Sequence, residues 1–373
     1  MTSAGPGAPE HARPASASAD EPPEAVDATE ATEATGATDA TGTTGTTYAT
    51  DIGPRDEEQP GIDWARVARA VGVRVLAVGF VLLGAATLAF AGLKLIPGDP
   101  VATLLGPQTT ASPAVREQIA ADYGFDDPVS SQYLHYLGEL LHGRLGESYQ
   151  LRQPVSALIG EQFWPTAQLA LAALGLAVVI AVVSALATAG RRSVLRSVLG
   201  AWELVAVSTP SFWLGIVLLT VFSFRLGWFP VAGSEGIETL VLPAVTLALP
   251  IAGVLAQVLR ESLDSALAEP FVVTARARGI GRTAVRVRHA FRHAAVPLLT
   301  LSGWLTGTLL GGTVLVEKVF ARPGIGALTL QSVNTKDMPV VMGVVLLAAL
   351  CFVVISQLTD VLYAVIDPRL RGR

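Results

Sequence analysis

The sequence predicts an all-α integral membrane protein with six transmembrane helices and a disordered acidic N-terminal tail. Of its 373 residues, 51% are hydrophobic and only 15% are charged, and the mean hydropathy is +0.51. Six charge-free stretches are each long enough to cross a hydrocarbon core of about 30 Å as a helix. Because water-soluble enzymes of this length are rarely so apolar, the composition argues against that class.

The acidic character of the chain belongs to its first 60 residues. This segment holds 12 acidic residues and 2 arginines, a net charge of −10, whereas residues 61–373 hold 19 acidic and 24 basic residues, a net charge of +5. The segment consists mainly of Ala, Thr, Glu, Gly and Pro. It buries too little apolar surface to offset chain entropy, so we expect residues 1–60 to be disordered.

The first charge-free stretch, Val75–Leu93, follows several arginines and contains a small-x-small pattern like a signal-peptidase site. It is too long for an ordinary signal core and lies too far from the N-terminus, so we expect an uncleaved first span. The other five stretches are Trp164–Gly190, Leu204–Phe224, Thr239–Leu259, Ala294–Val316 and Met338–Thr359.

Lysine and arginine are distributed unevenly between the two sides of these spans. If both termini face the cytoplasm, 17 basic residues from Arg55 onward lie inside, and 8 lie outside or at outer span ends. The positive-inside rule therefore predicts a multi-pass protein of the cytoplasmic membrane with both termini cytoplasmic.

Four regions follow from this topology. Residues 1–60 form the acidic tail, and residues 61–163 contain the first transmembrane helix and a long extracytoplasmic segment. Residues 164–360 form a five-helix transmembrane domain that includes a cytoplasmic loop at 260–293, and residues 361–373 form a short basic cytoplasmic C-terminus. Within the extracytoplasmic segment, the spacing of Tyr133, Leu134, Leu137, Leu140 and Leu141 predicts a short amphipathic helix.

Two spans carry small residues at every fourth position. The second span has alanine at 173, 177, 181, 185 and 189, and the fifth has Gly303, Gly307 and Gly311. Such ridges let helix backbones approach closely, so we interpret them as helix-packing faces rather than as a lining for solute. Pro210, Pro243, Pro250 and Pro297 fall in spans or at their ends, where each removes a backbone donor and is expected to bend its helix.

The chain shows little chemistry of its own. It has no GxxxxGK[ST] loop for holding a nucleotide, and its single cysteine cannot form a disulfide or a cysteine-ligated metal site within the chain. His289 and His293 lie four residues apart, but no acidic ligand is near them, and contact with membrane lipid headgroups explains them better. We expect no catalytic residue, no bound metal and no nucleic-acid partner.

Charged side chains are nearly absent from the predicted spans. Lys94, Arg225, Glu317 and Lys318 lie at outer ends and Asp360 lies near an inner end, all within reach of the membrane interfaces. An ion-driven carrier is expected to hold a buried intramembrane carboxylate. The energy source is therefore expected on another polypeptide.

The cytoplasmic loop begins with a predicted short helix between Glu269 and Gly281. Pro270 suits the first turn of a helix, and Gly279 or Gly281 suits its end. Phe271, Val272 and Ala275 share one face, and Arg276 and Arg278 are expected to project from it. Small and aromatic residues beside exposed arginines are typical of a projection that fits a groove on a soluble protein.

From about Val71 to the C-terminus, the sequence resembles the permease subunits of ABC importers, in the dipeptide, oligopeptide and nickel branch. The motifs that carry the resemblance are Ile96–Pro100, Tyr123–Pro128, Thr274–Gly279, Arg288–Pro297, Val319–Gly326 and Asp367–Arg371. The loop departs from the general importer pattern in one respect, because the Glu-Ala-Ala that precedes the glycine there is Val273-Thr274-Ala275 here.

The resemblance implies an inward transporter of a peptide-like solute that works only with partners. These are a second homologous permease subunit, two cytoplasmic ATPase subunits that hold ATP and Mg, and an extracytoplasmic solute-binding protein. On this reading the coupling helix that fits an ATPase groove consists of Thr274, Ala275, Arg276, Ala277, Arg278 and Gly279. The alternatives are an ion-coupled secondary carrier, a membrane scaffold that recruits a soluble partner, and the same importer with a nickel or other non-peptide substrate.

Overall fold

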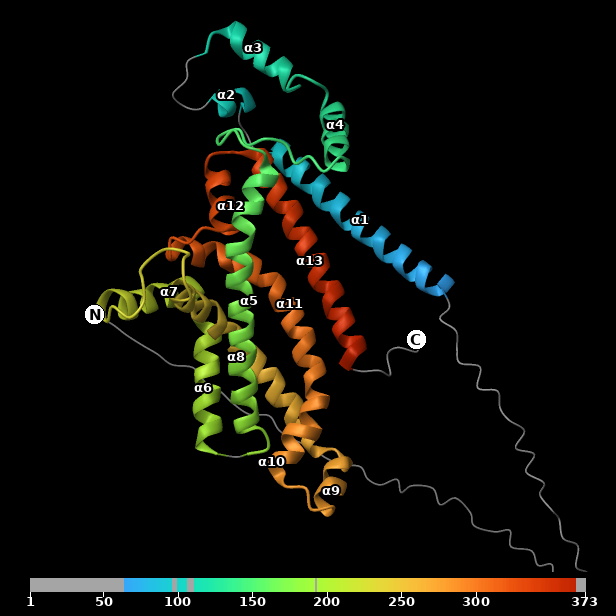
Figure 1. Ribbon diagram of the computed structural model, residues 1–373, viewed down its shortest axis with the longest axis vertical. Helices are drawn as coiled ribbons and strands as arrows, with labels where there is room; N and C mark the ends of the chain where they lie inside the picture. The colour runs from blue at the N-terminus through green and yellow to red at the C-terminus, as the bar shows by residue number, and fades with distance from the viewer. Residues whose placement is uncertain (1–63, 96–98, 106–110, 192, 367–373) are drawn as a thin grey trace, which may run out of the picture. The chain divides into compact units, whose positions relative to one another are not determined.

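The protein was analysed as a computed structural model that describes residues 64–95, 99–105, 111–191 and 193–366 (Figure 1). Regular structure within these ranges is helical, apart from an isolated bridge between Glu147 and Pro154. The all-α fold class is thus confirmed. The predicted disordered tail at 1–60 and the closing motif Asp367–Arg371 lie outside the described residues.

Four helices in the described ranges are long and apolar enough to cross a membrane unaided. They are α1 (Trp64–Leu95), α5 (Val155–Thr188), α8 (Glu238–Ala268) and α13 (Met338–Ile366). Two bent pairs complete the predicted six if each is one span. The first comprises α6 (Val194–Ser208) with α7 (Ser211–Leu218) and η1 (Leu219–Arg225), and the second comprises α10 (Arg282–Ala284), η2 (Val285–Ala290) and α11 (Phe291–Val319).

The third span differs from the uninterrupted stretch Leu204–Phe224 that its composition predicts. The two halves meet at an angle of 106°. Pro210 precedes α7, and Thr209 before it is extended, with φ −88° and ψ 124°. Proline disfavours the helical conformation of the preceding residue and supplies no backbone donor, so the bend predicted at Pro210 is confirmed as a complete break. Pro243 and Pro250 lie inside α8 and Pro297 lies inside α11, and both helices continue past these residues.

Helix α5 runs beside α8 through its alanine ridge, and α11 lies against both (Figure 1). Ala177, Ala181 and Ala185 are fully buried, as are Ala252 and Ala256 of α8. The small side chains allow close approach of the two helix axes. The alanine stripe is therefore a packing face, as predicted.

The glycine stripe of α11 faces α13 over part of its length. A Cβ atom added at Gly303 would lie 2.4 Å from Thr359 Oγ1, and one at Gly307 would lie 3.1 Å from Phe352. A Cβ atom added at Gly311 would have no neighbour within 4 Å. Gly311 lies beyond a bend of 53° that separates the helical segments Arg282–Leu309 and Gly311–Val319. The predicted packing ridge therefore ends at Gly307 in the described structure.

Short helices lie near the ends of these long ones. We call the two ends the α9 end, which carries α9 (Pro270–Ala277), and the α12 end, which carries α12 (Ile325–Asn334). Near the α12 end lie α2 (Pro100–Leu105), α3 (Pro113–Asp122) and α4 (Val129–Leu141) (Figure 1). The predicted amphipathic helix is α4, and it contacts α1 where the Tyr133 and Thr87 hydroxyls are 2.7 Å apart and the Tyr133 and Phe90 rings are 5.3 Å apart.

Candidate functional site

Helix α9 forms where its capping residues predict it. Glu269 precedes the helix in an extended conformation, and Pro270 occupies the first turn. At the other end Gly279 adopts φ +81°, and the Ile280 N–H donates to the Ala275 carbonyl at 3.2 Å. This is the left-handed glycine termination of a helix, so the predicted start and stop are both confirmed.

The two faces of α9 have different environments. Val272 is 5% exposed and Ala275 is 7% exposed, and both belong to one buried apolar cluster with Val285 of η2. Ala275 therefore holds the helix in place from its inner face and is not available to a partner. The remaining residues of the predicted coupling set are exposed, together with Val273 at 70%; they are Thr274, Arg276, Ala277, Arg278 and Gly279.

Aromatic contact ties α9 to the next long helix. The Phe271 ring lies 5.0 Å from the His293 ring, which belongs to the first turn of α11. Helix α9 is thus connected to α8 by the chain and to α11 by this ring contact.

Among the described residues no group of three His, Cys, Asp or Glu side chains is arranged to hold a metal ion.

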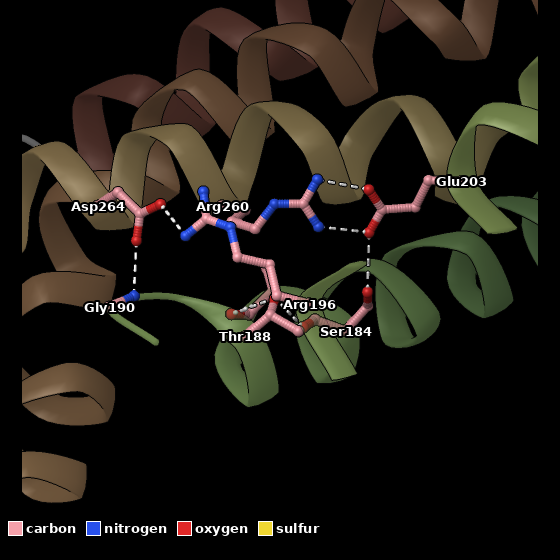
Figure 2. A network of polar contacts seen from close by, with 8 residues as sticks. Ser184, Thr188, Gly190, Arg196, Glu203, Arg260 and Asp264 are labelled. Atoms are coloured by element: carbon pink, nitrogen blue, oxygen red, sulfur yellow. Dashed lines mark hydrogen bonds and ion pairs between the residues drawn. The ribbon is translucent and has the colours of Figure 1, made fainter. Parts of the chain in front are cut away.

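A buried ion pair lies on α6 and α8 at the α9 end (Figure 2). Arg260 donates to both carboxylate oxygens of Glu203, at 2.7 and 2.6 Å, and Ser184 of α5 donates to the same carboxylate at 3.0 Å. Glu203 is fully buried, and the Arg260 side chain is 12% exposed. The bidentate geometry and the additional hydroxyl satisfy the charge of the buried Glu203 carboxylate.

A second acidic residue, Asp264 of α8, contacts the C-terminal end of α5 (Figure 2). The Gly190 N–H donates to Asp264 at 2.6 Å, and Arg196 of α6 forms an ion pair with Asp264 at 2.9 Å. From η2, the Arg286 guanidinium donates to the Leu186 carbonyl at 2.9 Å. We call the contacts of Glu203, Arg260 and Asp264 the polar network; it joins α5, α6 and α8 beside the segment that carries α9.

Sequence reasoning did not identify the polar network. Glu203 and Arg260 are 57 residues apart, and each stands next to a predicted span rather than within one. A sequence signal was nevertheless present, because Glu203 is the single acid in the apolar run from Val198 to Val207. An isolated acid in such a run is costly unless it is paired.

At the α12 end, Glu317 is buried rather than within reach of the membrane interface, which corrects the expectation from its position. It is 1% exposed. Its carboxylate accepts from the Thr166 hydroxyl at 2.6 Å and from the Ala327 N–H at 2.9 Å. Thr166 in turn accepts from the Ile325 N–H at 2.8 Å. The Glu317 side chain of α11 thus links α5 to the start of α12. A carboxylate is favourable at this place because the N-terminus of a helix presents free N–H groups.

The motif Val319–Gly326 provides the space for this contact. A Cβ atom at Gly324 would lie 2.3 Å from the Glu317 carboxylate, and one at Gly326 would lie 2.4 Å from Val314 Cα. Arg322 is 3% exposed, and burial lowers its pKa while the Glu317 carboxylate acts in the opposite direction. The glycines are therefore required by close contact between α11 and α12.

Asp337 anchors the loop before α5. It is 2% exposed and accepts from the Ser148 hydroxyl at 2.5 Å and from the Tyr149 and Gln150 N–H groups at 3.1 and 3.3 Å. Burial, aided by the charge of Asp337 and by Tyr123, raises the pKa of Tyr149 to about 12. The Tyr149 hydroxyl therefore stays protonated and neutral at every pH at which an ordinary tyrosine is neutral.

We expect Tyr149 to ionise well above the ordinary tyrosine pKa in an alkaline titration. Because its pKa is about 12 in the folded chain against 10.0 ordinarily, its contribution to stability is complete below the ordinary value and is lost as the pH rises toward the folded one. The ultraviolet absorbance of tyrosinate, compared between wild type and Tyr149→Phe, measures this. A difference spectrum that develops at the ordinary tyrosine pKa would contradict the burial of this hydroxyl.

Comparison of the sequence with the sequences of known proteins gives three matches. The sequence profile of the family described as "Binding-protein-dependent transport system inner membrane component" matches residues 143–372. A protein of Brucella abortus (strain 2308), named as a peptide transport system permease, is 38% identical over 315 residues, which are 82% of this chain and 97% of that protein. The glutathione transport system permease GsiC of Salmonella typhimurium is 38% identical over 301 residues, 80% of this chain and 97% of that one.

Among solved structures, the inward-facing MetNI methionine ABC transporter is similar over 57% of this chain and 97% of its own matched chain. The identity is 17% and the TM-score is 0.47.

Proposed function

The chain belongs to the family of binding-protein-dependent transport system inner membrane components, and from this membership we propose that it passes a peptide-like solute into the cytoplasm as one of two paired permease subunits. It is a multi-pass permease of the cytoplasmic membrane in the ABC importer class, and in this class ATP is hydrolysed by separate subunits. The peptide-like solute is supported by relatives named for peptide and glutathione transport.

The proposed orientation puts both termini and the α9 end in the cytoplasm. The distribution of Lys and Arg supports it, because the loop that contains α9 is the most basic of the described loops. In this orientation the α12 end faces the external solute-binding protein. The proposed division of the chain keeps residues 164–360 as the shared transmembrane domain and residues 61–163 as the segment particular to this branch.

The observation that carries the proposal is the two-sided character of α9. Val272 and Ala275 fix its inner face to η2, while Thr274, Arg276 and Arg278 remain exposed. A helix held on one face can transmit a displacement applied to the other. We therefore assign the coupling helix to Thr274–Gly279, extended by Val273, which stands where the general importer pattern has glutamate.

The motion proposed for α9 has two routes into the bundle. One is the contact of Phe271 with His293 at the start of α11, and the other is the direct continuation from α8. Because the polar network joins α8 to α5 and α6, these helices move together when α8 moves. Closure of the ATPase subunits on nucleotide then favours one arrangement of the bundle over the other, which is a shift of population driven by differential binding.

Val273→Asp is expected to abolish ATP-dependent uptake of a dipeptide by the reconstituted transporter. Because this chain has valine where the general importer pattern has glutamate, the groove of its own ATPase is expected to lack a partner for a carboxylate. An unpaired, desolvated carboxylate at this position is expected to weaken binding of the ATPase about tenfold or more. The measurement is uptake into proteoliposomes that hold the complete transporter with its solute-binding protein, together with the amount of ATPase that copurifies with the chain.

The matched control is Val287→Asp, since Val287 lies on η2 and is 50% exposed. We expect this variant to keep its ATPase. Equal loss of ATPase from both variants would contradict the coupling assignment.

Gly279→Val is expected to behave like Val273→Asp, because φ +81° strains any L side chain. Accumulation of solute against a gradient by the chain without companion proteins would overturn the importer reading itself.

A further inference from the structure

Positive charge gathers at the α9 end of the bundle, between the end of α5 and η2. Arg191 follows α5, Arg196 lies in the first turn of α6, and Arg286 belongs to η2. Asp264 of α8 lies among them with both carboxylate oxygens engaged, Oδ1 by the Gly190 N–H at 2.6 Å and Oδ2 by Arg196 at 2.9 Å (Figure 2). Three positive charges against one negative charge leave this group with an excess of positive charge.

The other charged side chains of α8 nearby do not balance this excess. Arg260 and Glu203 neutralise each other in their own ion pair. Glu261 lines a separate hollow with Phe271 and His293. Within the described ranges, neither Arg191 nor Arg286 forms an ion pair with an acid.

Arg286 is buried although most of its donors are unused. It is 7% exposed, and its hydrogen bond in the described part of the chain goes to the Leu186 carbonyl at 2.9 Å. Its Nε atom is buried without a partner. A guanidinium carries five N–H donors, and buried donors normally have acceptors.

Arg191 makes the position of Arg286 still less favourable. The charge of Arg191 acts against the charged form of Arg286, and only Asp264 acts in its favour. Two guanidinium groups at such a distance are favourable together when an anion accepts from both of them. A phosphate group has the charge and the acceptor oxygens for this role.

Apolar side chains lie exposed beside these guanidinium groups. Val194 is 80% exposed, Leu195 is 46% exposed and Val198 is 58% exposed, and all three belong to the beginning of α6. A free phosphate ion gains nothing from such a surface. A phospholipid does, because its acyl chains cover apolar side chains while its phosphate binds arginine at the membrane surface.

From these contacts we propose that Arg191 and Arg286, with the apolar beginning of α6, bind an anionic phospholipid of the cytoplasmic leaflet. The phosphate accepts from Arg191 and from unused donors of Arg286, and the acyl chains lie along α6. Asp264 holds Arg196 beside the headgroup. The choice of leaflet rests on the proposed orientation, and the lipid site itself goes beyond the proposed function.

The test titrates the detergent-purified full chain with dioleoyl-phosphatidylglycerol or dioleoyl-phosphatidylcholine, and native mass spectrometry measures the bound lipid. We expect phosphatidylglycerol to bind about tenfold more tightly, because the choline group brings a cation into an excess of positive charge. Arg191→Gln is expected to weaken the binding of phosphatidylglycerol about fivefold. Arg191 is exposed, so this variant keeps the packing of the bundle.

The matched control is Arg225→Gln, which makes the same change at an exposed arginine at the end of η1, between the exposed side chains of Phe224 and Leu226. We expect it to alter the affinity by no more than about twofold. Equal weakening by the two variants, or equal affinity for the two lipids, would overturn the inference. So would binding of inorganic phosphate as tight as that of phosphatidylglycerol, because the acyl chains would then contribute nothing.

The complete transporter separates a lipid site from a protein contact at the same place. Arg191→Gln is expected to keep its ATPase, in contrast to Val273→Asp. Loss of the ATPase from Arg191→Gln with unchanged lipid binding would show that Arg191 meets a protein and would overturn the lipid site. Lipid binding with the expected preference but without solute uptake supports the site and contradicts the proposed function instead.

Discussion

Glu203→Leu is expected to destabilise the chain by about 3–5 kcal/mol, because it leaves the Arg260 guanidinium buried without its carboxylate. Glu203 is fully buried, so no water replaces the lost charge. The Ser184 hydroxyl loses its acceptor at the same time. The measurement is the thermal unfolding midpoint of the detergent-solubilised chain, and we expect little folded chain at the growth temperature of the host.

Two further variants make this expectation specific. Glu261→Leu removes an exposed acid from the next position of α8, and we expect its effect to lie within about 0.5 kcal/mol. Glu203→Leu combined with Arg260→Leu removes both charges, and we expect it to regain most of the lost stability. If Glu203→Leu alone were as stable as Glu261→Leu, the ion pair would not hold α6 to α8.

Gly326→Ala is expected to prevent correct folding of the α12 end, with a cost of at least about 3 kcal/mol. The new Cβ atom would lie 2.4 Å from Val314 Cα and 2.9 Å from the Glu317 carboxylate. The first of these atoms belongs to the backbone of α11 and cannot move aside. The measurement is the yield of monodisperse protein together with its unfolding midpoint.

Gly311→Ala is the matched control, because Gly311 lies in the same helix as Val314 and a Cβ atom added there would have no neighbour within 4 Å. We expect this variant to fold with unchanged or slightly higher stability, since alanine favours a helix. Equal behaviour of the two variants would show that α11 and α12 are not in close contact in the folded protein.

Local features of the structure were predictable where local sequence determines them. The start and end of α9 follow from Pro270 and Gly279, because each residue favours one backbone conformation. The alanine stripe of α5 predicts its buried face, since a repeat of four residues keeps one side of a helix in contact with its neighbour. The break at Pro210 follows from proline, although its angle of 106° does not.

The buried carboxylates were not predictable in the same way. Glu317 stands at the end of an apolar stretch, where composition places it at the membrane interface. It is buried because α12 folds back over it, which depends on the absence of side chains at Gly324 and Gly326. Likewise, the partner of Glu203 is set by the contact of α6 with α8 and not by sequence spacing.

Helix α5 takes part in both carboxylate contacts, through Thr166 with Glu317 and through Ser184 with Glu203. The two hydroxyls are about 27 Å apart along the helix axis, given the rise per residue. A rigid rod of that length that tilts by about 10° at one hydroxyl displaces the other by about 5 Å. If the proposed function holds, a change of angle imposed by the ATPase subunits at the α9 end would therefore be transmitted to the α12 end through a single helix.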